Sequence, residues 1–575
     1  MTGILVAGTS SDAGKSLVVT ALCRAAVRQG IDVVPFKAQN MSNNSMVCAD
    51  GSEIGRAQYL QAAAARVQPS SAMNPVLLKP GTDRRSFIVL RGQPGGVLEA
   101  GQYTTGRQAL AEAAWAAYDE LAAAHDLVIC EGAGSPAEIN LRSGDYTNMG
   151  LARQKNLPVV LVGDIDRGGV LASIYGTWGL LDDADHALLA GYLINKFRGD
   201  DSVLAPGLAE ITRRTGLPSF GVLPWVPGVW LDGEDALEVG RWRHEGDAVD
   251  PTALRVAVVR FPRISNATDV DALAGETGVD VQVTTNPATC AAADIVVLPG
   301  SRSTIDDLAW LRSTGIAEVV AERAAQGRTV VGICGGYQML ARTIDDPQGQ
   351  EVAGGAQVPG LGLLPVDVDF AAEKTLTLSH GTWQGIEVGG YEIHHGTTTA
   401  DAGSEPFLDG VHVGSVWGTM WHGAFEHDDF RRTWLAQAAQ VAGSSWRPHT
   451  DELGYQARRE AMIDTLADAL VEHLDVGDFG GFVLQAIALR GHTPGSIALL
   501  LRDGGETILF SGDSLFPGGP GKTWSPEDFT SLMDDLEERV FDQLPDDTQV
   551  LPGHGAPTTL GAERGQLGEW RERGW

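Results

Sequence analysis

Residues 4–16, ILVAGTSSDAGKS, contain the pattern that decides the fold of the N-terminal region. The run Ile4–Ala7 is short and apolar, as in a buried strand, and an apolar stretch with helical character follows Ser16. The residues between these two runs are rich in glycine and serine. A strand, a glycine-rich loop and a helix in this order form the context that a phosphate-binding loop requires. The sequence therefore predicts an α/β domain with an anion site at the end of its first strand.

The residues of this loop indicate how it would hold ATP. Backbone N–H groups between Gly8 and Gly14 can surround phosphate oxygens. Lys15 can neutralise charge on the β- and γ-phosphates, and the Ser16 hydroxyl can bind Mg²⁺. Glu131 ends the apolar run of DLVICEGAGS and is placed to supply a second, acidic Mg²⁺ ligand. The alternative for Glu131 is a solvated carboxylate at a strand end.

Further apolar runs alternate with longer alanine-rich stretches up to about residue 235. This alternation predicts a mostly parallel sheet whose strands are joined by helical crossovers. The runs are Val33–Phe36, Leu127–Cys130, Val159–Val162 and Gly191–Ile194.

The length and charge of the chain limit the classes of function. At 575 residues the chain is too long for a single core. It carries 42 Lys and Arg against 74 Asp and Glu, a formal net charge of −32, which argues against nucleic acid or anionic lipid as a partner. The five cysteines form no C-x-x-C pair, and no apolar run reaches the length of a membrane span of about 18 residues. We therefore expect a soluble, cytoplasmic protein with free thiols.

Changes in composition predict five regions. A polar, acidic and glycine-containing stretch separates two α/β units, and the chain becomes β-rich with glycine-rich turns near its C-terminus. The predicted regions are a nucleotide-binding domain at 1–235, a linker at 236–252, a second α/β domain at 253–442, a helical tail at 443–475 and a C-terminal piece at 476–575.

Cys334 lies in VGICGGYQML, residues 331–340, between an apolar run and a helical one. The glycines on both sides permit a sharp turn, and the helix N-terminus favours the thiolate, as at a nucleophile elbow. With the preceding LPGS at 298–301, the pattern resembles the class I glutamine amidotransferases. That resemblance implies that Gly300 and Gly335 offer backbone N–H groups to a thioester oxyanion and that His422 is the base. The alternative is a buried structural cysteine.

The third member of the usual amidotransferase triad is absent from its expected place. Many class I members carry His-x-Glu, but Ala424 stands two residues after His422. Glu426 could instead orient the imidazole. We expect His394 and His395 to line or support the site rather than to perform chemistry.

Six segments of the first domain resemble the cobyric acid synthase family. They are PFKAQNMSNNS (35–45), EIGRAQ (53–58), MNPVLLKP (73–80), EGAGSPAEINL (131–141), DIDRGGV (164–170) and INKFRGD (194–200). The resemblance implies a dethiobiotin synthetase-like phosphate-loop domain. It also implies that ATP activates the remaining carboxylates of cobyrinic acid a,c-diamide and that ammonia from glutamine amidates four of them.

By analogy with the dethiobiotin synthetase-like group, Lys37 would lie over the transferred phosphate and Asn195 near the base. The anionic corrinoid needs positive partners, and several arginines of the first domain are candidates. They are Arg84, Arg85, Arg142, Arg167 and Arg198.

Two other functions remain open. Cobyrinic acid a,c-diamide synthase shares both domain types, although FKAQNMSNNS and SPAEINL argue against it. A regulatory phosphate-loop ATPase with an inactive amidotransferase domain would be expected to lack Cys334 or His422, and the sequence contains both.

The C-terminal piece resembles the second half of a metallo-β-lactamase-fold hydrolase. GHTPGS, FSGDSLF and LPGHG fit its metal-binding positions in order and supply His492, Asp513 and His554 as zinc candidates. The first metal cluster of that family, His-x-His-x-Asp-His, does not occur in this sequence. Three ligands cannot complete a dinuclear centre. We therefore expect a partial α+β domain without hydrolase activity and with apolar surface left uncovered.

Overall fold

The structure is a computed structural model that describes residues 3–82, 85–99, 107–229, 252–352, 354–474, 485–503 and 506–574. The chain divides into two compact units, one of residues 2–28 and 32–475 and the other of residues 1, 29–31 and 476–575. The predicted linker at 236–252 lies outside the described residues except for Thr252.

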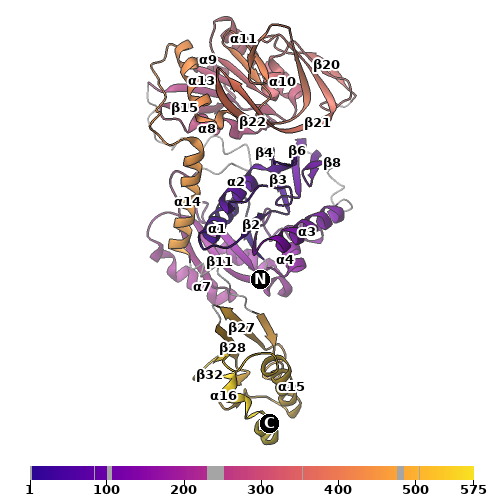
Figure 1. Cartoon of the computed structure of the whole chain (residues 1–575), viewed down its shortest axis with the longest axis vertical. Coiled ribbons are helices and arrows are strands. Elements are labelled where there is room, and N and C mark those ends of the chain that lie inside the picture. The colour runs from indigo at the N-terminus through magenta and orange to yellow at the C-terminus, as the bar shows by residue number, and fades with distance from the viewer. Residues whose placement is uncertain are drawn as a thin grey trace. The chain divides into compact units, whose positions relative to one another are not determined.

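The N-terminal domain is built on a six-stranded sheet in which every neighbouring pair is parallel (Figure 1). Its strand order is β12-β11-β10-β1-β9-β2, and its central strands are buried, which explains why they read as continuous apolar runs. The predicted parallel sheet is confirmed. The strands are β1 (Gly3–Gly8), β2 (Val33–Phe36), β9 (Leu127–Glu131), β10 (Val159–Asp164), β11 (Leu189–Phe197) and β12 (Ser219–Pro224).

The strand order places the phosphate-binding loop beside the acidic candidate. β1 pairs with β10 on one side and with β9 on the other, so the chain reverses its winding direction at β1. Ligands of open α/β sheets bind at such a point, outside the carboxyl ends of the strands. The connecting helices are α1 (Lys15–Arg28), α2 (Arg56–Ala65), α3 (Arg107–Ala124), α4 (Met149–Lys155), α5 (Val170–Leu180) and α7 (Ala205–Thr215).

A second, smaller sheet in this domain was not expected from the sequence. It has the strand order β3-β6-β7-β8, and a short hairpin of β4 and β5 lies between β3 and α2 in the sequence. These strands are β3 (Gln39–Met41), β4 (Ser45–Val47), β5 (Glu53–Gly55), β6 (Val76–Thr82), β7 (Arg85–Leu90) and β8 (Gln93–Glu99).

The second domain contains a seven-stranded sheet of order β15-β13-β16-β18-β25-β24-β23. The first five of these strands pair in parallel and the last two are antiparallel. They are β13 (Leu254–Val259), β15 (Val279–Thr284), β16 (Ile295–Leu298), β18 (Val330–Ile333), β23 (Glu405–Phe407), β24 (Gly410–Val413) and β25 (Val416–Thr419). The helices beside it are α9 (Pro287–Ala292), α10 (Thr304–Ser313), α11 (Ile316–Ala325), α12 (Gly335–Leu340) and α13 (Asp428–Val441).

A long hairpin extends from this domain. β21 (Val366–Trp383) and β22 (Ile386–Ala400) pair antiparallel and belong to a four-stranded sheet with β19 (Thr343–Asp346) and β20 (Ala356–Pro359). The two-residue turn has positive φ at Gln384 and Gly385, 51° and 84°, as tight hairpins require.

Within the larger unit, the predicted helical tail forms α14 (Tyr455–His473) and packs against α1. Fully buried Arg24 of α1 forms ion pairs with Asp464 at 2.7 Å and Glu460 at 2.8 Å. The Arg24 guanidinium also donates to the carbonyl oxygens of Ala63 and Ala64 at the end of α2. One arginine thus joins three helices.

The smaller unit has its own sheet and core. Its sheet order is β26-β27-β28-β31-β32, and its buried cluster includes Leu500, Leu532 and Trp570. Large apolar side chains that stay exposed in it are Ile497, Phe510 and Trp524. The elements are β26 (Gln485–Ala488), β27 (Ile497–Asp503), β28 (Glu506–Gly512), β31 (Gln549–Pro552), β32 (Thr558–Thr559), α15 (Pro526–Leu536), α16 (Leu560–Arg564) and α17 (Leu567–Arg573).

Among the helices that the structure describes, none combines the length and the apolar character that a membrane crossing needs.

Candidate functional site

The phosphate-binding loop joins β1 to α1, and its shape depends on Gly14. This residue has φ of 97°, and a Cβ there would collide with Nδ2 of Asn195 at the end of β11. Asn195 donates a hydrogen bond from Nδ2 to the Ala13 carbonyl oxygen at 3.0 Å. Asn195, which was expected near the base, thus contacts the backbone of the phosphate-binding loop.

Glu131 is fully buried at the carboxyl end of β9 and accepts hydrogen bonds from three side chains. Its carboxylate accepts hydrogen bonds from Ser16 Oγ at 2.8 Å, Lys37 Nζ at 2.8 Å and Gln61 Nε2 at 2.5 Å. Burial alone would raise the pKa of Glu131, but Lys37 and Gln61 hold the pKa below its ordinary value. Ser16 and Glu131 thus present adjacent oxygen atoms of the kind that Mg²⁺ prefers. Gln61 was missed because a glutamine in an alanine-rich helix gives no signal in the sequence.

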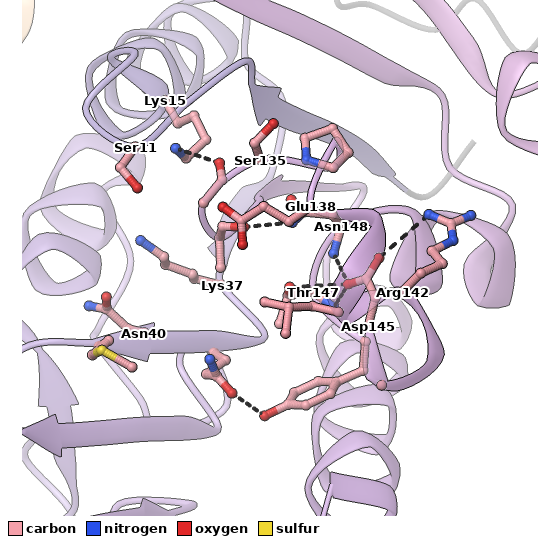
Figure 2. Close-up of a pocket in the computed structure, with 18 of the residues that line it drawn as sticks. Ser11, Lys15, Lys37, Asn40, Ser135, Glu138, Arg142, Asp145, Thr147 and Asn148 are labelled. Atoms are coloured by element: carbon pink, nitrogen blue, oxygen red, sulfur yellow. Dashed lines mark hydrogen bonds and ion pairs between the residues drawn. The ribbon is translucent and has the colours of Figure 1, made fainter. Parts of the chain in front are cut away.

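A cavity of about 400 Å³ opens beside Lys37 (Figure 2). Lys15 and Lys37 lie in its wall, and Lys15 Nζ donates to the carbonyl oxygens of Ser10 at 3.1 Å and Gly134 at 3.2 Å. Other lining residues are Ser11, Gln39, Asn40, Met41, Arg107, Ser135, Glu138, Arg142, Asp145, Tyr146, Thr147 and Asn148.

Of the arginines proposed to meet an anionic substrate, Arg142 lines this cavity and forms an ion pair with Asp185. Arg107, which the sequence did not single out, lines it as well. Arg167 is exposed, and Arg198 stacks on Trp225 at 4.1 Å from its ring centre; neither lines the cavity. Arg84 and the side chain of Arg85 lie outside the described residues.

Cys334 stands between β18 and α12 with φ of 49° and ψ of −108°, which is strained for a residue with a side chain. Its N–H donates to the Thr419 carbonyl oxygen of β25 at 2.8 Å. A Cβ on Gly336 would overlap the Leu298 carbonyl group, so only glycine lets the helix start this close to β16. These contacts form the elbow that the glycine-rich pattern predicts.

His422 follows β25 and contacts both Cys334 and a carboxylate. Its Nδ1 donates to Oδ2 of Asp269 at 2.6 Å, and its side chain and that of Asp269 are almost completely buried. Asp269 Oδ1 accepts the Gly423 N–H at 2.8 Å. Burial would lower the pKa of His422, but Asp269 and Cys334 raise it to about 10.

The carboxylate on His422 therefore comes from a distant segment. Asp269 belongs to a single helical turn, η4 (Ala267–Val270), and lies 153 residues before His422 in the sequence. The suggestion that Glu426 orients the imidazole is wrong, because Glu426 forms ion pairs with Arg56 and Arg459. Burial opposes this ionisation, yet the two arginines lower the pKa of Glu426 to about 2.

The two glycines expected to bind an oxyanion lie at the same place. Gly300 is in β17 (Gly300–Ser301), and a Cβ on it would lie 3.0 Å from Cε1 of His422. A Cβ on Gly335 would lie 2.7 Å from the Ser301 nitrogen. The structure thus brings Gly300 and Gly335 together with Cys334 and His422.

A second cavity of about 320 Å³ contains Cys334 in its wall. His394 and His395 also line it, as expected. His394 Nε2 lies 2.9 Å from Glu392 Oε2, and burial lowers the pKa of His395 to about 4. Glu351 lines the cavity too, and burial raises its pKa to about 7.

The three zinc candidates of the smaller unit lie near one another. Asp513 is between the two imidazoles, with Oδ2 at 3.8 Å from His492 Nε2 and Oδ1 at 3.7 Å from His554 Nε2. His492 Nδ1 donates to the Lys522 carbonyl oxygen at 2.8 Å. Over the part of the chain that the structure describes, no group of three or more such side chains is arranged to hold a metal ion.

Three family descriptions match the chain. Residues 4–238 match the CobQ/CobB/MinD/ParA nucleotide binding domain and residues 255–430 match the CobB/CobQ-like glutamine amidotransferase domain. Residues 413–554 match the metallo-beta-lactamase superfamily. These matches confirm the predicted domain families of the nucleotide-binding region, the amidotransferase region and the C-terminal region.

Several proteins named cobyric acid synthase are similar to this chain. The one from Cutibacterium acnes is 84% identical over 476 residues, which cover 83% of this chain and 98% of the relative. The one from Mycolicibacterium vanbaalenii is 55% identical over 479 residues, covering 83% of this chain and 95% of the relative. The one from Mycobacterium tuberculosis strain CDC 1551 is 53% identical over 482 residues, with the same coverage.

Proposed function

Because the chain belongs to the cobyric acid synthase family, we propose that it amidates four carboxylates of adenosylcobyrinic acid a,c-diamide with ATP and glutamine. The observation that carries this proposal is the presence in one compact unit of two sites with complementary chemistry. One site has the groups of a glutaminase, Cys334 and His422. The other has the groups of a phosphoryl-transfer site, Lys15 and Glu131.

The first half of the proposed reaction releases ammonia. The Cys334 sulfur attacks the side-chain carbonyl carbon of glutamine, and the backbone N–H groups of Gly300 and Gly335 stabilise the oxyanion. His422 transfers a proton to the departing nitrogen, so that ammonia leaves and a thioester remains. Water then hydrolyses the thioester to glutamate. Asp269 holds the imidazole in one orientation and stabilises its protonated form.

The second half makes the carboxylate reactive. A corrin carboxylate oxygen attacks the γ-phosphorus of ATP and gives an acyl phosphate and ADP. Lys15 and the loop N–H groups offset the charge on the transferred group. Ammonia then attacks the acyl carbon, phosphate leaves, and the amide forms. Mg²⁺, for which Ser16 and Glu131 provide oxygen ligands, would supply further charge neutralisation on the phosphates.

We also propose that the enzyme acts in the cytoplasm. All five cysteines are free and buried, which agrees with a reducing cytoplasm as the place of action. The substrates are charged small molecules, and nucleic acid has no part in the proposed reaction.

Mass spectrometry of the corrinoid tests this function. The enzyme is incubated with adenosylcobyrinic acid a,c-diamide, Mg-ATP and glutamine, and a ladder ending at four new amides is the expected result. Conversion of cobyrinic acid to its diamide, with no change in the diamide itself, would instead identify the a,c-diamide synthase. ATP hydrolysis without any amidation would favour a regulatory ATPase.

A matched variant separates the two sites. Cys334→Ala should abolish amidation with glutamine and retain amidation with ammonium chloride, because only the ammonia source is lost. A folded Cys334→Ala enzyme that fails with both nitrogen sources would contradict the assignment of Cys334.

A further inference from the structure

Two cavities of the larger unit share one short stretch of wall. Gln39, Asn40 and Met41 line the cavity that contains Lys15 and Lys37 (Figure 2). Asn43 lines the cavity that contains Cys334. Consecutive Cα atoms are about 3.8 Å apart, so the Cα atoms of Met41 and Asn43 are no more than about 7.6 Å apart. At this point the two cavities therefore come within one or two side chains of each other.

The shared stretch, residues 39–45, is held against the glutaminase site by three hydrogen bonds. Asn266 N–H donates to the Asn43 carbonyl oxygen at 3.4 Å, and Ser45 N–H donates to Asn266 Oδ1 at 3.0 Å. Ala267 N–H donates to Asn44 Oδ1 at 3.0 Å. Asn266 and Ala267, which make these contacts, closely precede Asp269, the partner of His422, in the sequence. The stretch is thus fixed relative to the groups that would release ammonia.

Apart from the apolar and exposed Met41, the side chains of this stretch are polar and uncharged, and some have unused hydrogen-bonding capacity. Asn43 Oδ1 is buried and has no hydrogen-bond partner within the described chain. The same holds for two amide atoms of α2, Gln58 Nε2 and Gln61 Oε1. Gln58 accepts from Asn40 at 2.9 Å and Gln61 donates to Glu131 at 2.5 Å, so these amides lead toward the phosphoryl-transfer site. Buried polar atoms without partners are rare, and a small polar molecule could use them.

The charges around the cavity that contains Cys334 favour ammonia over ammonium. Lys79, Lys374 and Arg302 all line it. Burial, Lys374 and Arg302 together lower the pKa of Lys79 to about 8, although Glu53 opposes them. Burial and then Lys374 and Arg302 also lower the pKa of His395. These three cations outnumber the carboxyl group of Glu351, whose pKa burial raises to about 7, so a further cation is disfavoured and we expect nitrogen to leave this cavity as neutral ammonia.

We propose that residues 39–45 form the passage by which ammonia moves from Cys334 to the acyl phosphate, with Asn43 at its entrance and the amides of Asn40, Gln58 and Gln61 along it. This inference rests on the proposed function and adds the route. Ammonia donates and accepts hydrogen bonds, so neutral amides can pass it along without trapping it as an ion. The passage keeps ammonia from the solvent, where most of it would be protonated at neutral pH.

An isotope competition tests the passage in the full-length enzyme. Glutamine labelled with nitrogen-15 in its amide is supplied together with excess unlabelled ammonium chloride, and mass spectrometry measures the label in the corrin amides. The wild-type product should keep the label. Asn43→Leu, which replaces the polar entrance by a bulkier apolar side chain, should lose label toward the proportion in the bulk solution while glutamate is still formed. Asn43→Ser, which stays small and polar, should keep the label.

The controls separate this inference from the proposed function. Gln326→Leu removes an exposed amide that follows α11 and should leave the label unchanged. Label retained by Asn43→Leu, or absent from the wild-type product, would overturn the passage. Failure of the wild type to amidate the corrinoid with either nitrogen source would instead overturn the proposed function. The measured quantity is the fraction of nitrogen-15 in the corrin amides, so it can be determined even for a variant that reacts slowly. If Asn43→Leu does not fold, Asn43→Met is tested in its place.

Discussion

Asp269 determines the state of His422 in this protein. The two side chains are almost fully buried and share a hydrogen bond of 2.6 Å, so the imidazole has one available orientation. A buried imidazolium would be unfavourable without a carboxylate, and Asp269 supplies that charge. The third position of the usual triad is therefore filled by a residue from another part of the chain.

Replacing this carboxylate should affect glutamine hydrolysis alone. We expect Asp269→Asn to lower kcat for glutamate formation on the order of 10²–10⁴-fold, because His422 loses the partner that orients it and stabilises its charge. Steady-state assays of glutamate formation and of ammonium-driven amidation measure the two halves separately. An equal loss in both would show that Asp269 supports the fold rather than the glutaminase.

The same pair makes stability depend on pH. The pKa of His422 is raised from 6.5 to about 10, so the folded protein holds this proton more tightly than the unfolded chain. The resulting stabilisation is fully present below pH 6.5 and is lost as pH rises through about 10. Thermal unfolding across this window should show a smaller decline for Asp269→Asn than for the wild type. Parallel declines in the two proteins would contradict the linkage.

At the scale of elements, the connection from β1 to α1 sets the phosphate-binding loop. Its path depends on positive φ at Gly14 and on the close approach of Asn195 from β11. The crossover that places β9 next to β1 brings Glu131 to Ser16 across 115 residues of sequence. The site thus depends on the order of strands as much as on the loop itself.

A single methyl group added at Gly14 should separate ATP-dependent amidation from glutamine hydrolysis. Gly14→Ala introduces a Cβ that collides with Asn195, so we expect loss of ATP-dependent amidation with glutamate formation retained. The matched control is Gly176→Ala in α5, where no neighbouring atom lies within 4 Å of the added Cβ. It should raise stability by up to about 1 kcal/mol, because alanine favours a helix over glycine. Normal amidation by Gly14→Ala would show that the loop adjusts.

At the scale of the whole molecule, the C-terminal 100 residues form a unit with its own sheet and core. None of the groups proposed for the reaction belongs to it. The relatives from Cutibacterium and Mycolicibacterium align with only 83% of this chain. The larger unit therefore contains every residue that the proposed mechanism uses.

Removing this unit should leave the reaction intact. A chain ending at Asp475 is expected to keep the wild-type rate of glutamine-driven amidation, measured by mass spectrometry of the corrinoid. A large loss of rate in a folded protein would show that the C-terminal unit contributes to the enzyme. In the full-length protein, stoichiometric zinc binding with turnover of a thioester or lactone would contradict the expectation that this unit is not a hydrolase.

The sequence by itself determined the elements whose signals are local. The strand before Gly8, the loop through Ser16, and the elbow at Cys334 each lie within about a dozen residues, where apolar periodicity and glycine spacing are sufficient. The buried parallel strands were visible for the same reason, because their apolar runs are continuous. His422 was predicted from the resemblance to the class I glutamine amidotransferases, whose histidine position it matches.

Only the tertiary structure decided which distant side chains meet. Asp269 and His422, Gln61 and Glu131, and the pairing of Glu426 with Arg56 join residues 70 to 370 positions apart. No sequence periodicity predicts such pairs. Asp269–His422 and Gln61–Glu131 depend on how elements are arranged within one domain, and Arg56–Glu426 depends on the packing of one domain against the other. The stretch between the two cavities is also defined only by the tertiary structure. The sequence identifies FKAQNMSNNS as a motif, but only the folded chain places it between the two sites.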